Sequence, residues 1–478
     1  MATAVESGTT LLIGGEWVET ERKFRVRSPY DESTIAEIGW GDKRHAHAAI
    51  DAAERAMKSP LPAHRRAQLL DEVAARLKEK KADFARTIAL EAGKPIASAA
   101  LEVDRAIQTL VFSAAAARNL TGEAMGLDAH PAGEGRLAVV LRVPIGIVAA
   151  ITPFNFPLNL VAHKVAPALA AGCACILKPA DKAPLSGLLL AELFTDAGLP
   201  GGWLNVVVGD AQELADVFIN DDRVKAISFT GSAEVGWGLR AKAPKKKVLL
   251  ELGNSTPVIV LHDADIEQAA TAIVAHGFGF GGQTCISVQR VYVERSVCHS
   301  LVEKLLPKIE ALKVGDPLNP ETQVGPLITS ASRDRVMDWI QDAEQQGAKV
   351  LTGGRVEGGG ILQPTLLTDV SPDMSVSCRE VFGPVVILSA VKNLEEAIEL
   401  ANATPYGLHA GIFTSNVNAA LKAATRLEFG GVTINESPSF RADQMPYGGV
   451  KASGNTREGP KYAIEELTER RMVIFRLP

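Results

Sequence analysis

Short apolar segments alternate with stretches of helical spacing between residues 135 and 261, and this alternation restricts the fold more than any other feature. The segments expected to be strands are Val139–Val143, Ile145–Thr152, Cys175–Leu177, Leu204–Val208, Ala226–Phe229, Val248–Leu250 and Pro257–Leu261. A helix is expected at Leu185–Ala197, and another begins near Ser232. Short buried strands separated by helices predict a parallel, doubly wound sheet, which binds its ligands at the carboxyl ends of the strands.

The segments on either side extend this α/β pattern. Apolar residues at helical spacing predict a helix at Arg65–Glu79, and a second α/β region after Leu261 contains expected helices at Cys298–Leu312 and Ser332–Gln346. The chain ends in a strand-like segment, Arg471–Phe475. Because neither this segment nor Val139–Val143 has a local pairing partner in the sequence, we expect a partner subunit to complete their sheet.

Composition excludes several classes of function. The 478 residues suit two or three domains, and a net charge of -6 gives no basic surface for nucleic acid. No apolar run approaches the roughly 20 residues of a membrane span, and residues 1–10 lack the features of a signal peptide. Five cysteines without framework spacing indicate a reducing, cytoplasmic setting, and the nine histidines show no metal-ligand spacing.

Two segments that follow predicted strands suit a nucleotide. The segment from Phe229 to Gly236 places a helix start at Gly231–Ser232, where free N–H groups can bind a pyrophosphate. It lacks the G-x-G-x-x-G fingerprint, and an ordinary N-cap serine explains it equally well. After another strand, Lys178 can donate to ribose or phosphate, and Asp181 can accept from a ribose 2′-OH and repel a 2′-phosphate. The alternative for this second segment is a surface turn.

Two further segments suit nucleophilic catalysis. Asn155 lies between two prolines after a buried strand, and this rigid backbone suits a preorganised donor to an oxyanion. The alternative is an ordinary asparagine turn. Cys285 ends a glycine-rich run that begins at Gly277, and Glu251 ends a strand 34 residues before it. A lone cysteine is more often an inert apolar residue, which is our interpretation of the other four cysteines, Cys173, Cys175, Cys298 and Cys378.

Taken together, these segments resemble the aldehyde dehydrogenase superfamily in order and spacing from about residue 10 to 475. The set comprises Asn155, Lys178, Phe229–Ser232, Glu251, Gly281–Cys285, the Glu380–Pro384 segment and the closing Met445–Gly454 segment. The chain departs from the family at Asn254, where a second glycine usually follows Glu-Leu-Gly. It looks similar to the branch that acts on lactaldehyde, succinate semialdehyde and glyceraldehyde 3-phosphate.

The resemblance implies a role for each matching residue. Cys285 is the expected nucleophile, Glu251 the base for the deacylating water, and Asn155 part of the oxyanion hole with the Cys285 N–H. Lys178 and Glu380 are expected to hold the two riboses. The full set of expected cofactor residues is Ile151, Thr152, Pro153, Phe154, Lys178, Ala180, Asp181, Gly209, Phe229, Thr230, Gly231, Ser232, Val235, Leu252, Glu380 and Phe382. We expect NAD to be preferred because of Asp181, with NADP use also possible.

The resemblance also implies an architecture and a substrate class. A dinucleotide-binding domain takes residues 1–123 and 145–252, a catalytic domain 253–461, and a small β oligomerisation element 124–144 with 462–478, which builds a homodimer or homotetramer. The residues expected to line the substrate tunnel are Arg105, Asn159, His163, Arg290 and Arg441. Such polar residues favour a small polar or anionic aldehyde. The alternative for Arg105 and Arg290 is a structural ion pair.

Three other functions stay open at this point. A CoA-acylating dehydrogenase would use the same thioester without needing Glu251 as a base. A hydrolase using Cys285 without redox chemistry would not need the cofactor segments. A structural protein would have no reason to keep Cys285, Glu251 and Asn155 together.

Overall fold

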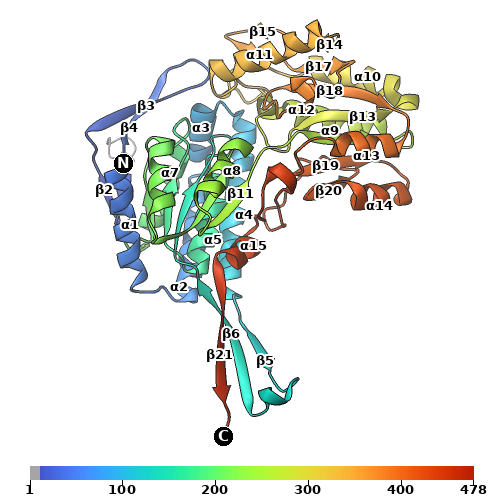
Figure 1. Cartoon of the computed structure of the whole chain (residues 1–478). Coiled ribbons are helices and arrows are strands. Elements are labelled where there is room, and N and C mark those ends of the chain that lie inside the picture. Colours follow the sequence, from blue (N-terminus) through green and yellow to red (C-terminus); the bar gives the residue numbers. More distant parts are fainter. Residues whose placement is uncertain (1–10) are drawn as a thin grey trace.

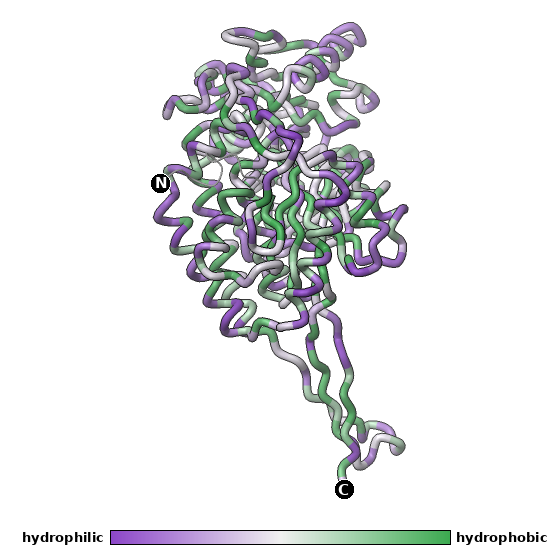
Figure 2. The backbone as a smooth tube through the Cα atoms, turned by 90° about the vertical axis from the view of Figure 1, so that its left-hand side faces the viewer, coloured by the Kyte–Doolittle hydropathy of each residue, from purple (hydrophilic) through white to green (hydrophobic). Residues whose placement is uncertain are grey.

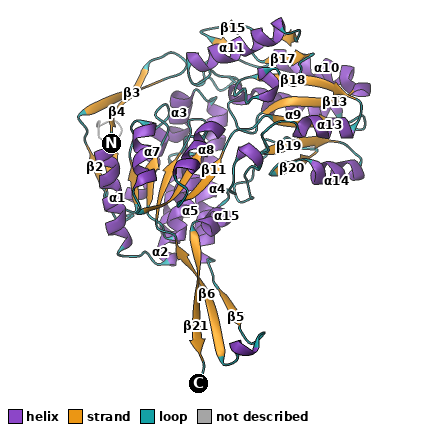
Figure 3. Cartoon of the chain, in the orientation of Figure 1, coloured by secondary structure: helices purple, strands orange, loops and turns teal. Residues whose placement is uncertain are grey.

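The computed structural model describes residues 11–478, so the expectation that residues 1–10 are not a signal peptide lies outside the described residues. Two seven-stranded sheets form two lobes, and a three-stranded sheet projects from them as an arm with the C-terminus at its tip (Figure 1). Helices surround both large sheets (Figure 3), which confirms the α/β fold class. Over the described part of the chain, no helix combines the length and apolarity needed to cross a membrane.

The first large sheet is parallel and doubly wound, as predicted, and contains five of the seven predicted strands. Pro257–Leu261 lies instead in the second large sheet, and Val139–Val143 lies in the arm. The strands of the first sheet, in spatial order, are β11 (Lys247–Glu251), β10 (Val224–Thr230), β7 (Ile147–Ile151), β8 (Cys175–Lys178), β9 (Leu204–Val206), β1 (Leu11–Ile13) and β2 (Glu16–Val18). The five strands from β11 to β9 are parallel, and β1 and β2 extend the edge antiparallel. From β7 the chain adds β8 and β9 on one side. It then returns to add β10 and β11 on the other side of β7, so the direction of strand addition reverses between β7 and β10. Ligands of such sheets bind at that reversal.

Helices cover both faces of this sheet. One face carries α1 (Lys43–Met57), α7 (Ala211–Asn220) and α8 (Ala233–Lys242), and the other carries α5 (Asn159–Ala171) and α6 (Leu185–Asp196). Further helices pack outside α5 and α6: α2 (Ala63–Glu79), α3 (Lys81–Ala92), α4 (Ile96–Arg118) and α15 (Pro460–Glu466). The predicted helix at Arg65–Glu79 is confirmed as α2, since its residues at helical spacing are the ones that are buried.

The second large sheet is parallel except at one edge. Its strands, in spatial order, are β14 (Lys349–Thr352), β17 (Thr365–Thr368), β18 (Val385–Val391), β13 (Val288–Glu294), β12 (Thr256–Val260), β19 (His409–Phe413) and β20 (Gly431–Ile434), and β14 alone is antiparallel. Its helices are α9 (Ile266–Phe278), α10 (Arg295–Glu310), α11 (Ser330–Gln345), α12 (Ser375–Cys378), α13 (Leu394–Asn402) and α14 (Val417–Arg426). The predicted helices Cys298–Leu312 and Ser332–Gln346 correspond to α10 and α11 with slightly different ends.

The arm corrects one prediction. Val139–Val143 and Arg471–Phe475 lie in β6 (Arg136–Pro144) and β21 (Thr468–Arg476), which pair with each other over their whole length, while β5 (Glu123–Gly126) pairs with the other side of β6. The two strands therefore do have a partner within the chain, although more than 300 residues separate them in sequence. The outer edge of β21 remains unpaired in the described chain. Hydrophobic stretches continue along the arm to its tip (Figure 2).

Two short hairpins complete the described structure. They are formed by β3 (Arg22–Arg27) with β4 (Thr34–Trp40), and by β15 (Val356–Glu357) with β16 (Ile361–Leu362). At the junction of the lobes, the carboxyl ends of β7, β10 and β11 meet the loop that leads from α9 into β13.

Candidate active site

A cavity of about 480 Å³ lies where the two lobes meet, and it contains the three expected catalytic side chains. Its wall combines residues from α4, from the carboxyl ends of the first sheet, and from the loops of the second lobe. The expected site residues in the wall are Arg105, Pro153, Phe154, Asn155, Asn159, Thr230, Gly231, Ser232, Glu251, Leu252, Cys285, Glu380, Phe382 and Arg441. Segments more than 300 residues apart in sequence thus contribute to one cavity.

The loop before Cys285 has a backbone that requires glycine. Phe280, Gly281 and Gly282 all have positive φ values, 53°, 62° and 69°, a conformation that only glycine adopts without strain. A Cβ atom on Gly282 would also lie 2.1 Å from the carbonyl oxygen of Gly383. The glycine-rich run therefore turns the chain tightly against the second lobe and presents Cys285 at the cavity.

The Cys285 side chain is half-buried and packs among apolar residues, including Ile286, Leu408 and Met445. Burial raises the pKa of its thiol to about 12, and a hydrogen bond with Tyr447 partly offsets this rise. The Sγ atom lies 2.9 Å from the Tyr447 hydroxyl oxygen. Sequence reasoning did not single out this contact, although Tyr447 lies within the closing motif.

The Asn155 side chain is anchored to the same loop. Its Nδ2 donates to the carbonyl oxygen of Gln283, at 2.9 Å, and its Oδ1 has no hydrogen-bond partner among the described residues. Gln283 is itself fixed, since its side chain accepts from the Ile328 N–H at 2.9 Å. An amide nitrogen carries two protons, so one N–H of Asn155 remains after the bond to Gln283. The amide is thus a preorganised donor next to the nucleophile's loop.

A buried ion pair supports the segment that carries Asn155. Lys94 and Glu102 pair with each other, and Glu102 also accepts from the backbone N–H groups of Leu158 and Asn159 at 3.0 and 3.1 Å. These N–H groups belong to the start of α5, which has no capping side chain of its own. The Lys94 ammonium also lies 3.7 Å from the centre of the Phe156 ring. Sequence reasoning did not identify this pair.

Glu251 is the last residue of β11 and is buried beside Gly448, and neither of its carboxylate oxygens is hydrogen-bonded within the described part of the chain. Burial raises its pKa well above the ordinary value, and the nearby Glu458 carboxylate raises it further. Lys164 and Arg441 act in the opposite direction. An unpartnered carboxylate with a raised pKa is suited to take a proton from water near neutral pH.

The reversal point of the first sheet has the features of a dinucleotide site. The hydroxyls of Thr152, after β7, and Thr230, at the end of β10, are buried without a hydrogen-bond partner. The prediction that a strand ends at Phe229 and a helix starts near Ser232 agrees with β10 and α8. Ser232 caps α8 by accepting from the Val235 N–H at 3.4 Å. Ser232 is therefore an N-cap residue, and the start of α8 lies where a nucleotide phosphate could also bind. These unpartnered donors fit a nucleotide phosphate and ribose.

Lys178, the last residue of β8, pairs with Ile151 of β7 and is buried, and burial lowers its pKa. Within the described chain, its ammonium has no hydrogen-bond partner, which leaves it available to ribose hydroxyls. Asp181 follows at the surface, half-exposed. Gly209 has a structural reason to be glycine, because a Cβ there would lie 2.4 Å from the carbonyl oxygen of Gly41. Ala180 also follows β8.

Glu380 and Phe382 close the cavity from the second lobe. Glu380 accepts from the Asn254 N–H at 3.1 Å, and burial raises its pKa to about 7. A Cβ on Gly253 would lie 2.2 Å from the Glu380 carboxylate, so a larger residue there would displace the Glu380 side chain. The Phe382 ring meets the Phe154 ring edge-on, with 5.9 Å between centres.

Asn254, the departure from the family pattern, ties the turn after Glu251 to the second sheet. Its Nδ2 donates to the Thr256 hydroxyl and to the carbonyl oxygen of His409, at 2.8 and 3.0 Å. Its Oδ1 accepts from the Leu408 N–H at 3.3 Å. The turn therefore gains side-chain anchors that a glycine could not supply.

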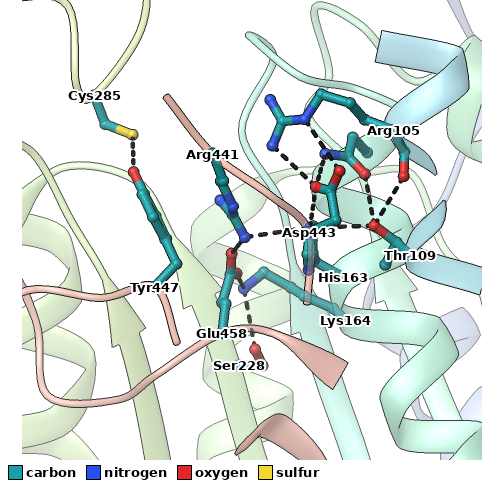
Figure 4. A network of polar contacts seen from close by, with 11 residues as sticks. Arg105, Thr109, His163, Lys164, Ser228, Cys285, Arg441, Asp443, Tyr447 and Glu458 are labelled. Atoms are coloured by element: carbon teal, nitrogen blue, oxygen red, sulfur yellow. Dashed lines mark hydrogen bonds and ion pairs between the residues drawn. The ribbon is translucent and has the colours of Figure 1, made fainter. Parts of the chain in front are cut away.

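Arg441, one of the residues expected to line the substrate tunnel, lies in the cavity wall. Its side chain is 6% exposed, donates to Glu458 at 2.9 Å and lies 3.2 Å from His163 Nε2 (Figure 4). Its guanidinium lies 3.8 Å from the centre of the Tyr447 ring. The Arg441 Nε is buried and has no partner. Glu458 also pairs with Lys164 at 3.3 Å.

Asp443 gathers the other polar residues that were expected in the tunnel. Arg105 donates to it through two nitrogens, at 2.9 and 3.3 Å, Asn159 donates at 3.2 Å, and His163 lies 3.0 Å away (Figure 4). His163 is not in the cavity wall, where Arg105 and Asn159 are. The Asp443 pKa is low because His163 and Arg105 contact the carboxylate. Arg105 thus forms the ion pair that sequence reasoning kept as an alternative.

The structure corrects the expectation for Arg290. This side chain is fully buried in β13 and lies outside the cavity wall. Its nitrogens donate to the carbonyl oxygens of Ser255, Leu400 and Ala401. Two of those carbonyls belong to the end of α13, where a cation satisfies groups that have no helical partner.

Comparison with known proteins gives a consistent result over nearly the whole chain. The model of the aldehyde dehydrogenase family matches residues 17–473. A 3-sulfolactaldehyde dehydrogenase of Priestia megaterium is 44% identical over 467 residues, which cover 98% of each chain. A lactaldehyde dehydrogenase of Methanocaldococcus jannaschii is 41% identical over 97% of this chain and 100% of its own. A glyceraldehyde-3-phosphate dehydrogenase structure from the same organism, complexed with NADP, has a TM-score of 0.91 at 41% identity, covering 95% of this chain and 100% of its own.

Proposed function

The chain belongs to the aldehyde dehydrogenase family and is a pyridine-nucleotide-dependent aldehyde dehydrogenase, and we propose that it oxidises small aldehydes bearing an anion or hydroxyl groups through a thioester on Cys285. The observation that carries the substrate class is Arg441, in the wall of the cavity that contains Cys285. Its buried Nε has no partner. Such a donor suits the oxygen of a carboxylate, sulfonate or phosphate.

In the proposed acylation step, the Cys285 thiolate attacks the aldehyde carbon. A C–S bond forms as the carbonyl π electrons move to oxygen, and the alkoxide accepts from the Asn155 amide and the Cys285 N–H. When the C=O bond re-forms, the C–H bond breaks and the hydride leaves with its electron pair. A bound nicotinamide supplies the acceptor for that hydride. A thioester on Cys285 remains.

In the proposed deacylation step, Glu251 takes a proton from a water molecule whose oxygen attacks the thioester carbon. The C–S bond breaks, its electron pair returns to Cys285 as a thiolate, and the carboxylic acid ionises. The raised pKa and the absence of hydrogen bonds on Glu251 support this role. Lys164 and Arg441 keep the charged form of Glu251 accessible.

Two of the relatives are named for anionic aldehydes, because sulfolactaldehyde carries a sulfonate and glyceraldehyde 3-phosphate carries a phosphate. A third is named for lactaldehyde, which is neutral and hydroxylated. These names support a small polar substrate for this chain. We propose that Arg441 binds the anion directly, and that Arg105 and Asn159 bind substrate hydroxyls. His163 lies behind Arg441 and is proposed to orient it.

For the cofactor we propose NAD in preference to NADP. Asp181 carries a negative charge just after Lys178, and no hydrogen bond or ion pair holds it within the described chain. A carboxylate there accepts from a ribose 2′-OH and repels a 2′-phosphate. Lys178 and Glu380 are proposed to hold the riboses, and Phe382 to pack beside the nicotinamide.

We also propose the predicted division into domains: residues 1–123 with 145–252, residues 253–461, and residues 124–144 with 462–478. The last pair forms the arm, whose β21 has a free edge and exposed Met472, Ile474 and Phe475. An exposed apolar strand edge favours association, so we propose a homodimer or homotetramer. Light scattering after gel filtration would measure its mass. Five free cysteines support a reducing, cytosolic setting.

A substrate panel tests the function directly. The purified protein is incubated with NAD or NADP, with and without CoA, and with succinate semialdehyde, lactaldehyde, glyceraldehyde 3-phosphate, hexanal or benzaldehyde. We expect the first three aldehydes to give the higher kcat/KM, without CoA. A requirement for CoA would replace hydrolysis by acyl transfer. Hexanal or benzaldehyde as the best substrate would refute the substrate class.

A further inference from the structure

The hydroxyl of Tyr447 contacts the sulfur of Cys285, and the surrounding residues fix it there (Figure 4). Tyr447 is 2% exposed and lies in the cavity wall. The Arg441 guanidinium covers its ring at 3.8 Å, and the His409 ring packs at 4.9 Å. The two ring contacts leave the phenol little freedom to turn away from the sulfur.

The proton between the two atoms belongs to the phenol. The Tyr447 hydroxyl has no other hydrogen-bond partner within the described chain, and neither has the Cys285 sulfur. An S–H group is a weak donor, and an O–H group is a much better one. Burial also raises the Tyr447 pKa well above its ordinary value, so the phenol keeps its proton. The hydroxyl therefore donates to sulfur.

We propose that Tyr447 is a catalytic residue, whose hydroxyl donates a hydrogen bond to the Cys285 thiolate when that thiolate attacks the aldehyde and again when it leaves the thioester. This inference rests on the proposed role of Cys285 as the nucleophile. In the first step the bond increases the fraction of thiolate, and in the second it stabilises the negative charge that returns to sulfur. The Tyr447 proton stays on its oxygen in both steps, so the bonds that form and break are those of the acylation and deacylation steps described above.

The charged groups that face Cys285 do not replace the Tyr447 hydroxyl as a hydrogen-bond donor. Glu380 and Glu251 raise the thiol pKa, and Arg441 lowers it through space. None of these three groups is hydrogen-bonded to the sulfur within the described chain, whereas Tyr447 is. Arg441 also places its positive charge over the Tyr447 ring, which makes the phenol a stronger donor.

The size of the effect follows from two opposing terms. A hydrogen bond to a charged group shifts an ionisation equilibrium by about ten- to a hundredfold. Without it, the thiolate fraction falls by that factor, while each remaining thiolate becomes about three- to eightfold more nucleophilic, since reactivity follows pKa with a slope of about 0.4–0.5. The net rate of thiolate attack should therefore fall about three- to tenfold in Tyr447→Phe.

The test measures Cys285 alkylation by iodoacetamide between about pH 6 and 9, followed by mass spectrometry of the Cys285 peptide. We expect Tyr447→Phe to slow alkylation about three- to tenfold at every pH, with the hydride burst slowed similarly. Tyr292→Phe is the matched control, because Tyr292 is also a buried phenol but bonds Arg290 and lies outside the cavity. It should leave alkylation unchanged. An equal or faster rate in Tyr447→Phe would overturn the proposal.

A second measurement covers the case in which Tyr447→Phe is destabilised. Replacing all five tyrosines with 3-fluorotyrosine, a more acidic phenol, should accelerate alkylation in the otherwise unchanged protein. Unchanged or slower alkylation of the fluorinated protein would overturn the proposal. Cys285→Ala separates the two levels: if it still oxidises aldehydes, the proposed function fails. If it is inactive while Tyr447→Phe alkylates normally, only the role of Tyr447 fails.

Discussion

Replacing Arg441 with alanine would remove a cation from the cavity wall and separate two effects that the structure combines in one side chain. One guanidinium nitrogen donates to Glu458 at 2.9 Å, whereas Nε has no hydrogen-bond partner among residues 11–478. The group also covers the Tyr447 ring. The loss of Nε should affect only substrates that carry an anion, while the loss of the contacts to Glu458 and Tyr447 should affect every aldehyde.

The expected magnitude follows from these contacts. A hydrogen bond between two charged groups contributes about 1.5–3 kcal/mol, and about 1.4 kcal/mol corresponds to tenfold. For succinate semialdehyde, kcat/KM should therefore fall about ten- to a hundredfold more in Arg441→Ala than it falls for lactaldehyde. Glu458 keeps Lys164 as a partner at 3.3 Å, so the folded state should survive the substitution.

Steady-state kinetics with both aldehydes would measure this difference, with the melting temperature as a check on folding. Arg441→Lys is the matched variant, since an ammonium can still pair with Glu458 but lacks the planar fork of the guanidinium. It should restore activity toward lactaldehyde more fully than toward succinate semialdehyde. Equal losses for the charged and the neutral aldehyde would show that Arg441 acts only through its protein neighbours and would refute anion recognition.

Three further predictions concern the chemistry and the cofactor. Cys285→Ala should abolish aldehyde oxidation and leave cofactor binding by fluorescence intact; activity above a few per cent of wild type would contradict the nucleophile. Glu251→Gln should release a burst of reduced cofactor and then stall, and unchanged steady-state turnover in this variant would point to another base. In the wild type, turnover should rise with pH through the raised pKa of Glu251, because only the ionised carboxylate accepts a proton. Asp181→Ser should raise kcat/KM with NADP relative to NAD; comparable use of both cofactors by the unchanged protein would show that Asp181 does not discriminate.

Most of the first lobe could be predicted from the sequence because its signals are local. A strand buried on both faces needs an uninterrupted apolar run, which β7 has at all five positions. The helix predicted at Leu185–Ala197 is observed at Leu185–Asp196. The pairing of β6 with β21 was missed, because no local pattern specifies which of many distant segments completes a strand.

The cationic residues show where sequence reasoning fails. Arg290 and Arg441 are both arginines near expected site segments, and both are buried. Arg290 is surrounded by backbone carbonyls that satisfy its nitrogens, whereas Arg441 keeps an unpartnered Nε in the cavity wall. Only the three-dimensional neighbours distinguish a structural cation from an available one, and spacing along the chain carries no information about them.

The contact between Tyr447 and Cys285 depends on the same kind of long-range arrangement. The two residues are 162 positions apart, and the arginine over the tyrosine ring contacts Glu458 and His163 of α5. Each of these groups is an ordinary polar residue in its own segment. Buried together, they connect the group proposed to bind the anion of the substrate with the sulfur proposed to attack its aldehyde carbon.

An anion bound to Arg441 would weaken the positive field over the Tyr447 ring, so the thiol of the substrate complex should be slightly less acidic than that of the free enzyme. Succinate, the product of succinate semialdehyde oxidation, should therefore slow alkylation of Cys285 in the wild type more than in Arg441→Ala. The neutral lactamide is the control for simple blockage of the cavity, and succinate should slow alkylation of the wild type more than lactamide does.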